Sequence, residues 1–164
     1  MESPLALLFK AIQNQISSEV EEIKLIDQNL AQYLNEDKRK SMLFPCVLID
    51  FPNCDFTALQ GNIQLANLTI SLSLFFDVWN GTHNTAPDTV IEAGLNYLEI
   101  EHKVFSCLQG FSTNFTTPFV RTNSKSQNIN DVGLIVKEMT LTTSYEDWTL
   151  NNDNYVSLGI ANGN

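Results

Sequence analysis

The sequence predicts an α+β fold, in which a mostly antiparallel sheet with a long central strand carries two helices packed on one face. Residues 64–78 alternate between apolar and polar side chains, which is the period of a half-buried strand. Residues 4–18 and 87–108 carry apolar side chains at helical spacing. The expected order of elements is helix, strand, loop, strand, long strand, helix, strand, strand, which favours helices gathered on one face of a sheet.

The first helix is expected to begin at Ser3-Pro4, because serine is a favoured N-cap and proline is tolerated at the first helical position. Its apolar stripe has spacings of three, four and four residues and consists of Leu5, Leu8, Ile12 and Ile16. A short strand with weaker alternation follows over residues 22–27. The N-terminal part therefore predicts an amphipathic helix of about four turns and one strand.

Residues 28–42 are polar and end in the charged run Glu36–Lys40, which predicts a solvated loop. Residues 43–51 are apolar on both faces and predict an interior strand. Pro52-Asn53 is expected to end this strand, because proline lacks the N–H that a sheet ladder needs. Residues 54–62 are then expected to form a connecting loop with Gly61 at its turn.

The long strand is the most informative element. Its even positions are all apolar: Ala66, Leu68, Ile70, Leu72, Leu74, Phe76 and Val78. Its odd positions are mostly short and polar, so the two sets point to opposite faces of the sheet. At roughly 3.3 Å per residue the strand would run about 45–50 Å, well beyond the usual length. We therefore expect something beyond the domain to cover its far end, which indicates assembly.

The second helix is expected to open at Pro87-Asp88 and to stop at Gly110. Its predicted apolar stripe consists of Ile91, Leu95, Leu98, His102 and Phe105. Residues 111–120 are expected to be irregular or extended, residues 122–131 to form an Asn- and Ser-rich loop, and residues 132–145 to form the last strand. We place a single domain at residues 1–146 and an extended C-terminal arm at residues 147–164.

No set of residues predicts catalysis, a cofactor or a metal. His102 and Cys107 are five residues apart on a helix, so their side chains diverge by about 140° and do not form a thiol–imidazole pair. His83 lies between Asp77 and Asp88 but is a single imidazole, whereas metal sites need several converging ligands. We predict that the protein is not an enzyme.

Composition restricts the class of partner. The formal charge is −10, and the basic run Lys38–Lys40 directly follows two acidic residues, which argues against tight nucleic-acid binding. The three cysteines, Cys46, Cys54 and Cys107, predict free thiols. No apolar run is long enough for a membrane span, and residues 1–4 lack the features of a signal peptide. We expect a product of the cytoplasm without membrane contact.

The order of elements resembles the tail-terminator, or tail-completion, proteins of long-tailed bacteriophages. The resemblance rests on the N-terminal helix with its strand, on the hydrophobic block 44–51 followed by the alternating strand 64–79, and on the helix 87–108 followed by Phe119-Val120-Arg121-Thr122 and the strand 133–145. It covers about residues 1–146. The charged loop Glu36–Lys40 and the tail from Asp147 onward have no counterpart.

The resemblance implies a non-enzymatic virion protein of the tail or neck, assembled in the host cytoplasm. Such a protein forms a ring, typically of six subunits, that caps the tail tube, meets the tail tube protein and a neck or connector protein, and lets DNA pass through its lumen without specific binding. An acidic lumen would repel DNA, and the net charge agrees with this. The predicted subunit contacts are Ser71, Ser73, Phe75, Trp79, Trp148 and Tyr155.

Other interpretations stay open at this point. The chain could be another head–tail connector or stopper ring, or a tube cap of a phage-derived contractile injection system. A different class is a stand-alone cytosolic binding module with a ligand pocket between sheet and helices. The binding module predicts a stable monomer or dimer with an apolar cavity, whereas the ring predicts self-association.

Overall fold

A computed structural model describes residues 3–78, 81–127 and 132–149. Within these residues one five-stranded sheet has the order β1-β2-β3-β5-β4. Its strands are β1 (Leu25–Gln28), β2 (Cys46–Ala58), β3 (Gln64–Phe76), β4 (Val120–Ser126) and β5 (Ile135–Asp147). Only β1 and β2 pair in parallel among the described strands, and the other three pairings are antiparallel. The predicted α+β class with a mostly antiparallel sheet is confirmed.

Strand β3 lies at the centre of the sheet, as predicted, and spans 13 residues. Its helix-facing side chains, from Ala66 to Phe76 at every second position, are at most 1% exposed. However, β2 pairs with β3 up to Gln64, and β5 pairs with it over its full length. Two further 13-residue strands of the same chain thus pair with both edges of β3. The expectation that something beyond the domain covers the far end of this strand stays a prediction.

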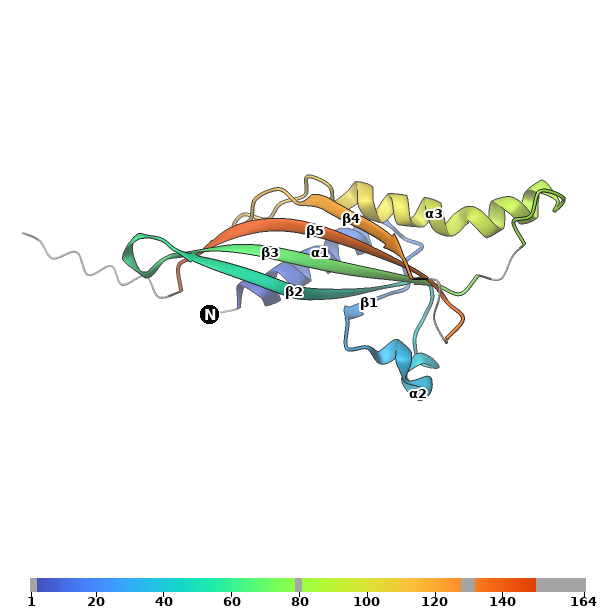
Figure 1. Ribbon diagram of the computed structural model, residues 1–164, viewed down its shortest axis with the longest axis horizontal. Coiled ribbons are helices and arrows are strands. Elements are labelled where there is room, and N and C mark those ends of the chain that lie inside the picture. Colours follow the sequence, from blue (N-terminus) through green and yellow to red (C-terminus); the bar gives the residue numbers. More distant parts are fainter. Residues whose placement is uncertain (1–2, 79–80, 128–131, 150–164) are drawn as a thin grey trace, which may run out of the picture.

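Strand β2 continues through Pro52, so the predicted end of the strand and the predicted loop over residues 54–62 are wrong. The register between β2 and β3 shifts between Asp50 and Asn53, which marks a β-bulge. Strand β1 pairs with β2 only as far as Ile49, so Pro52 lies where β2 has become an edge strand. At that position the missing N–H removes no ladder hydrogen bond. The β2–β3 hairpin then extends to one end of the molecule (Figure 1).

Helices α1 (Pro4–Glu19) and α3 (Asp88–Leu108) cover one face of the sheet, as predicted. Helix α1 buries Leu8, Ile12 and Ile16, three of the four positions of its predicted stripe. Gln15 Nε2 donates to the carbonyl oxygen of Cys107 at 3.1 Å and so ties α1 to the end of α3. The side chains between sheet and helices form one buried apolar cluster in the described part of the chain. This cluster fills the space in which a ligand pocket was considered.

Helix α3 has the predicted bounds, with Gly110 in the left-handed region (φ 79°) just beyond its C-cap. The face predicted to be buried is wrong. The sheet covers Gly94, Ile100, Val104 and Leu108, whereas Leu95 and Leu98 are 42% and 37% exposed. The helix carries apolar residues on two faces, and its N-terminal part extends past the sheet at the end opposite the hairpin (Figure 1). Periodicity alone did not distinguish these two faces.

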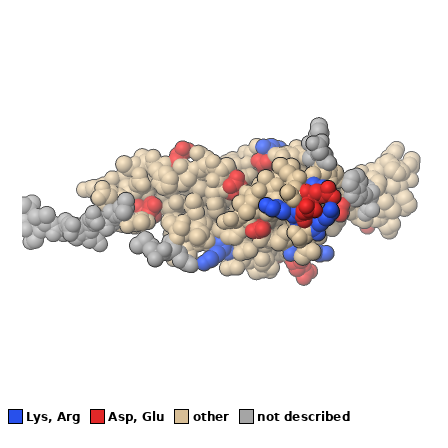
Figure 2. All heavy atoms as spheres, turned by 90° about the horizontal axis from the view of Figure 1, so that it is seen from below, with Lys and Arg blue, Asp and Glu red and all other residues tan. Residues whose placement is uncertain are grey.

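The segment between β1 and β2 forms a flap, residues 29–45, on the other side of the sheet. It contains a short 3-10 helix, Gln32–Leu34, and helix α2 (Glu36–Arg39), where a solvated loop was predicted. The Asn35 side chain caps α2 by accepting from the Lys38 N–H at 3.0 Å. Figure 2 shows acidic and basic side chains gathered around α2, so the charged run is solvated as expected.

Strand β4 occupies residues that were predicted to form part of an Asn- and Ser-rich loop. Every residue of β4 is exposed, so its sequence lacks the alternation that identifies a half-buried strand. Strand β4 forms because the edge of β5 is free to pair with it. The pairing includes a register shift between Arg121 and Asn123. The predicted last strand is confirmed as β5, displaced by two or three residues at each end.

Candidate assembly surfaces

The face of the sheet opposite α1 and α3 is largely uncovered, and we call it the open face. Pairing places the odd-numbered side chains of β3 on it, with Ser71 opposite Thr140 of β5 and Asp50 of β2. Its side chains are polar and most are short; along β3 they range from exposed Asn67 to buried Ser73, and along β5 they are partly exposed. The open face consists of Asp50, Asn53, Asp55, Asn67, Thr69, Ser71, Ser73, Asn123, Lys125, Glu138, Thr140, Thr142 and Ser144.

The flap and the open face enclose a hollow of about 360 Å³. Asn29 and Tyr33 of the flap form one side of it, and Ser71 and Ser73 lie on its floor. Ser73 is 7% exposed, so it is reached only through this hollow. The two predicted contact serines therefore share one shallow polar depression, in which short side chains let a neighbouring surface approach the backbone closely.

Phe75, the third predicted contact residue, is 1% exposed because the flap covers it. The rings of Tyr33 and Phe75 lie 4.6 Å apart between centroids. The guanidinium of Arg39 donates to the Tyr33 carbonyl oxygen at 3.0 Å and so anchors the flap in place. Around this pair lies a second, smaller core whose other buried members are Met42, Cys46, Leu48, Leu134 and Val136. In the single chain Phe75 is therefore a core residue, because the flap of the same chain buries its ring.

The remaining predicted contact residues lie apart from the open face. Trp148 lies just beyond the end of β5, where it is 54% exposed and its Nε1 donates to Glu146 Oε2 at 3.0 Å. Trp79 and Tyr155 lie outside the described residues. The structure thus brings Ser71, Ser73 and Phe75 together along one strand and separates Trp148 from them.

The outer side of α3 presents a second surface that sequence reasoning had placed in the core. We call it the α3 stripe, and it consists of Ile91, Leu95, Leu98 and His102. Its flanks are held by contacts to neighbouring elements. Lys103 forms an ion pair with Glu22 on one side, and on the other the Arg121 guanidinium lies 3.5 Å from the centroid of the Phe105 ring. The helical spacing of this stripe was evident in the sequence, but the sequence did not show that the stripe faces away from the sheet.

Charge on the open face is mixed and mildly acidic. Lys125 pairs with Glu138 at 3.0 Å, while Asp50 and Asp55 have no cation opposite them among the open-face residues. Glu101 on the inner side of α3 lies 3.8 Å from Lys137 of β5 and accepts from Ser124 of β4 at 2.9 Å. The contacts of Glu101 with Lys137 and Ser124 thus hold α3 against the sheet.

The candidate chemical groups do not assemble into a reactive site. His102 stacks against Phe105 with 6.2 Å between ring centroids, and the Cys107 thiol donates to the Val104 carbonyl oxygen at 3.2 Å. Burial raises the pKa of the Cys107 thiol to about 11 and that of Cys46 to about 12, which keeps both protonated and unreactive at neutral pH. The three cysteines are free thiols, as predicted.

Metal ligands are likewise dispersed. Within residues 3–78, 81–127 and 132–149 there is no group of three His, Cys, Asp or Glu side chains that could hold a metal ion. His83 Nδ1 lies 2.9 Å from Thr85 Oγ1 in the loop before α3. Over the same described residues, no helix combines the length and the apolar content needed to cross a membrane.

Comparison with known proteins adds a likeness in fold. No family model and no curated protein sequence matches this chain. Among solved structures the fold is similar to a chain from the virion of a native gene transfer agent particle, with a TM-score of 0.51 and 9% sequence identity. The match covers 85% of this chain and 95% of that chain. The α+β architecture of this protein is therefore one that also occurs in a chain of a gene transfer agent virion.

Proposed function

We propose that the chain is a virion structural protein of a phage-type particle and that it acts as a tail terminator. In this role copies of the chain form a ring, of about six subunits by resemblance to that family, which caps the tail tube and joins it to the neck. The observation that carries the proposal is the likeness in fold to a gene transfer agent virion chain over nearly the whole of both chains.

A closed ring needs two different surfaces on each subunit, because each copy meets its neighbours head to tail. The open face and the α3 stripe meet this requirement, since they lie on opposite sides of the sheet. We assign the subunit contact to these two surfaces, with Ser71 and Ser73 on one partner and Leu95 and Leu98 on the other. The apolar stripe would then lose the exposure that it has in the single chain.

The net charge of −10 supports a ring through which DNA passes. An acidic wall repels the phosphates of DNA, so the DNA slides through the ring instead of being bound. Some cations of the described surface are engaged in ion pairs, as Lys40 is with Glu36, Lys103 with Glu22 and Lys125 with Glu138. We therefore expect no sequence-specific contact with DNA.

A stopper or connector ring of the neck is the second candidate, and the same likeness in fold favours it. The two roles differ in what the ring meets. A terminator stops the growth of a polymerising tail tube, whereas a stopper meets the completed neck and leaves tube length unchanged.

The test measures mass by light scattering over a wide concentration range, with electron micrographs of the same samples, and then adds the chain to polymerising tail tube protein from the same genome. We expect rings, alone or on tube ends, and shorter tubes at higher ratios of this chain. Rings that leave tube length unchanged would favour the stopper. A strict monomer that neither binds nor shortens tubes would contradict the terminator role.

Substitutions test the assigned contacts. Leu98→Asp places a charge on the α3 stripe and should abolish rings without unfolding the chain. Asn96→Asp is the matched control, because it adds the same charge to an exposed position of α3 about 160° away around the helix. Equal assembly of both variants would remove the α3 stripe from the interface.

A further inference from the structure

The flap carries the most exposed large apolar side chains of the described residues. Leu30, Leu34 and Leu43 are 71%, 62% and 59% exposed, and we call these three side chains the flap leucines. They belong to one short segment, residues 29–45, between β1 and β2. Exposed leucines gathered in this way mark an interaction surface.

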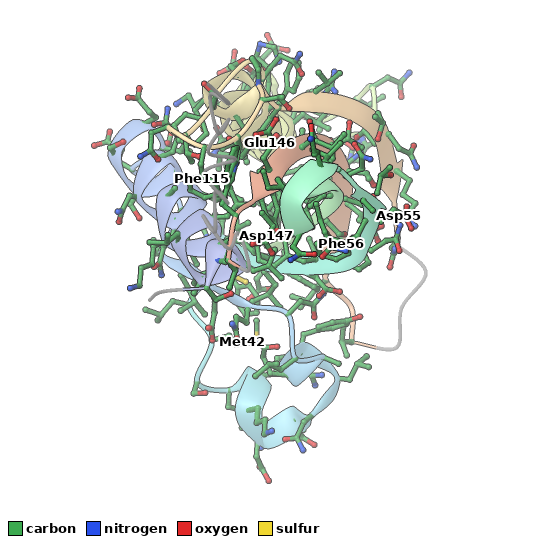
Figure 3. The ribbon with its side chains drawn as sticks, turned by 90° about the vertical axis from the view of Figure 1, so that its left-hand side faces the viewer. Met42, Asp55, Phe56, Phe115, Glu146 and Asp147 are labelled. Atoms are coloured by element: carbon green, nitrogen blue, oxygen red, sulfur yellow. The ribbon has the colours of Figure 1, made fainter. Side chains whose placement is uncertain are left out.

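Contacts within the chain hold the flap leucines in place. The Leu30 N–H donates to Gln32 Oε1 at 2.7 Å, and the Leu34 N–H donates to the Ala31 carbonyl oxygen at 3.1 Å. On the inner side, Met42 belongs to the smaller core that joins the flap to the sheet, and Figure 3 shows it at the base of the flap. A partner therefore meets a surface that is already ordered, so little conformational entropy is lost on binding.

The α3 stripe has a complementary chemical character. An exposed acidic row runs beside it, in which Asp88, Glu92 and Glu99 lie about 20–60° around the helix from Leu95. Helix α3 has four carboxylates against one lysine, whereas the flap has three cations against two carboxylates. Two apolar surfaces whose flanks have opposite net charge attract each other and meet in a fixed orientation.

The arrangement of the two surfaces favours a second copy as the partner. Figure 1 shows α3 above the sheet and the flap below it, both away from the end that carries the β2–β3 hairpin, and Figure 3 shows the same opposite sides from one end. One chain thus carries both surfaces but cannot join them, because its own sheet lies between them. A head-to-tail neighbour brings its α3 to the flap of the next copy.

The flap leucines also extend the contact assigned to the open face. Asn29 and Tyr33 of the flap line the hollow that has Ser71 and Ser73 on its floor. The two serines give the α3 stripe a polar counterpart, and the flap leucines beside them give it an apolar one. The contact between copies then buries apolar area on both partners.

We propose that the flap leucines of one copy pack against the α3 stripe of the next copy. Lys38 of the flap, which is exposed in the single chain, then faces the acidic row of the neighbour. This contact rests on the proposed ring, and it forms the apolar part of the interface between its subunits.

The first measurement compares two substitutions at one position. Leu34→Asp and Leu34→Lys both remove the leucine side chain, so both should raise the concentration at which half of the chain assembles in light scattering. Leu34→Asp should raise it about tenfold or more and Leu34→Lys only about threefold, because the aspartate alone is repelled by the acidic row. Thr57→Asp, at an exposed position of the hairpin, is the control and should leave the concentration unchanged. Circular dichroism checks that each variant is folded.

A charge pair across the contact gives the second measurement. Leu98→Lys alone should also weaken assembly. Leu34→Asp and Leu98→Lys together in one chain should restore the half-assembly concentration to within about threefold of the unsubstituted value, because opposite charges then meet between copies within a Debye length of about 8 Å.

Tail tube length, recorded on the same samples, separates this contact from the proposed function. Equal assembly of Leu34→Asp and the unsubstituted chain, or no restoration in the double variant, would overturn the flap contact, and shortened tubes would then still support a terminator. Restored assembly without shortened tubes would support the flap contact and favour the stopper. An unsubstituted chain that stays monomeric at every concentration, with and without tubes, would overturn the flap contact.

Discussion

The two faces of β3 differ in what covers them, although the same thirteen residues form both. On the helix side every second side chain is buried by α1 and α3. On the open side only the end of the strand is covered, where the flap closes over Phe75. The difference shows that alternation identifies two faces but not their coverage, because coverage depends on elements that lie far away in the sequence.

The largest expected effect separates these two faces. Leu72→Asp places an unpaired charge among fully buried side chains and should destabilise the domain by at least about 4 kcal/mol, enough to unfold it. Ser71→Asp, one residue away on the open face, should leave the domain folded. Urea unfolding followed by circular dichroism measures both. Equal stability of the two variants would mean that the faces of β3 are assigned wrongly.

The flap provides the next test, because it decides whether Phe75 is a core residue or a contact residue. Phe75→Ala removes a fully buried ring and should lower the free energy of unfolding by about 3 kcal/mol or more. Tyr33→Ala, on the half-buried partner ring, should lower it by roughly half as much. If Phe75→Ala changed the oligomeric mass but not the stability, the flap would have to open during assembly.

Helix α3 also has two apolar faces, one buried against the sheet and one exposed, and the next prediction compares them. Ile100→Ala should destabilise the domain by about 2–4 kcal/mol, because Ile100 is 4% exposed and packs on the sheet. Leu98→Ala should change the stability of the monomer by less than about 0.5 kcal/mol, because Leu98 faces solvent. Thermal unfolding at low protein concentration measures both without the contribution of any subunit contact.

The smallest effect concerns alkaline pH. Burial raises the pKa of Cys46 to about 12, while the same thiol in the unfolded chain ionises near 9. Between these values the unfolded chain loses a proton that the folded chain keeps, so stability falls as pH rises by up to about 1.4 kcal/mol per pH unit. Below pH 9 the thiol contributes no pH dependence. Unfolding at pH 8 and pH 10 measures the change.

Cys46→Ala should roughly halve this alkaline slope, because the Cys107 thiol, whose pKa burial raises to about 11, remains. Cys54→Ala should alter the slope less, because Cys54 is only partly buried. The buried Tyr145, whose pKa is also raised to about 12, contributes in the same direction and remains in both variants. An unchanged slope in Cys46→Ala would show that the smaller core under the flap opens to water before the domain unfolds.

Much of the fold follows from local pattern. The bounds of α1 and α3, the alternation of β3 and the α+β class were all predictable, because amphipathic spacing and capping residues act within a few positions of the chain. The errors occurred at positions where a neighbour overrides the local signal. Pro52 lies within β2 because the strand has lost one neighbour there, and β4 pairs although its sequence shows no alternation.

The candidate surfaces were also only partly predictable from local pattern. The sequence alone identified Ser71 and Ser73 as outward-facing, since they alternate with buried positions. It did not reveal that Tyr33 covers Phe75, that the stripe through Leu98 faces away from the sheet, or that Leu7, Phe115 and Trp148 meet in one groove. These contacts join residues from distant parts of the chain, so no local pattern encodes them.

The sequence by itself therefore determined the elements and the two-sided character of the central strand, because hydrophobic periodicity is a property of consecutive residues. The tertiary structure decided which apolar face is covered and which remains free. That choice depends on the total apolar area that all the elements bury together, and it is made only when they pack.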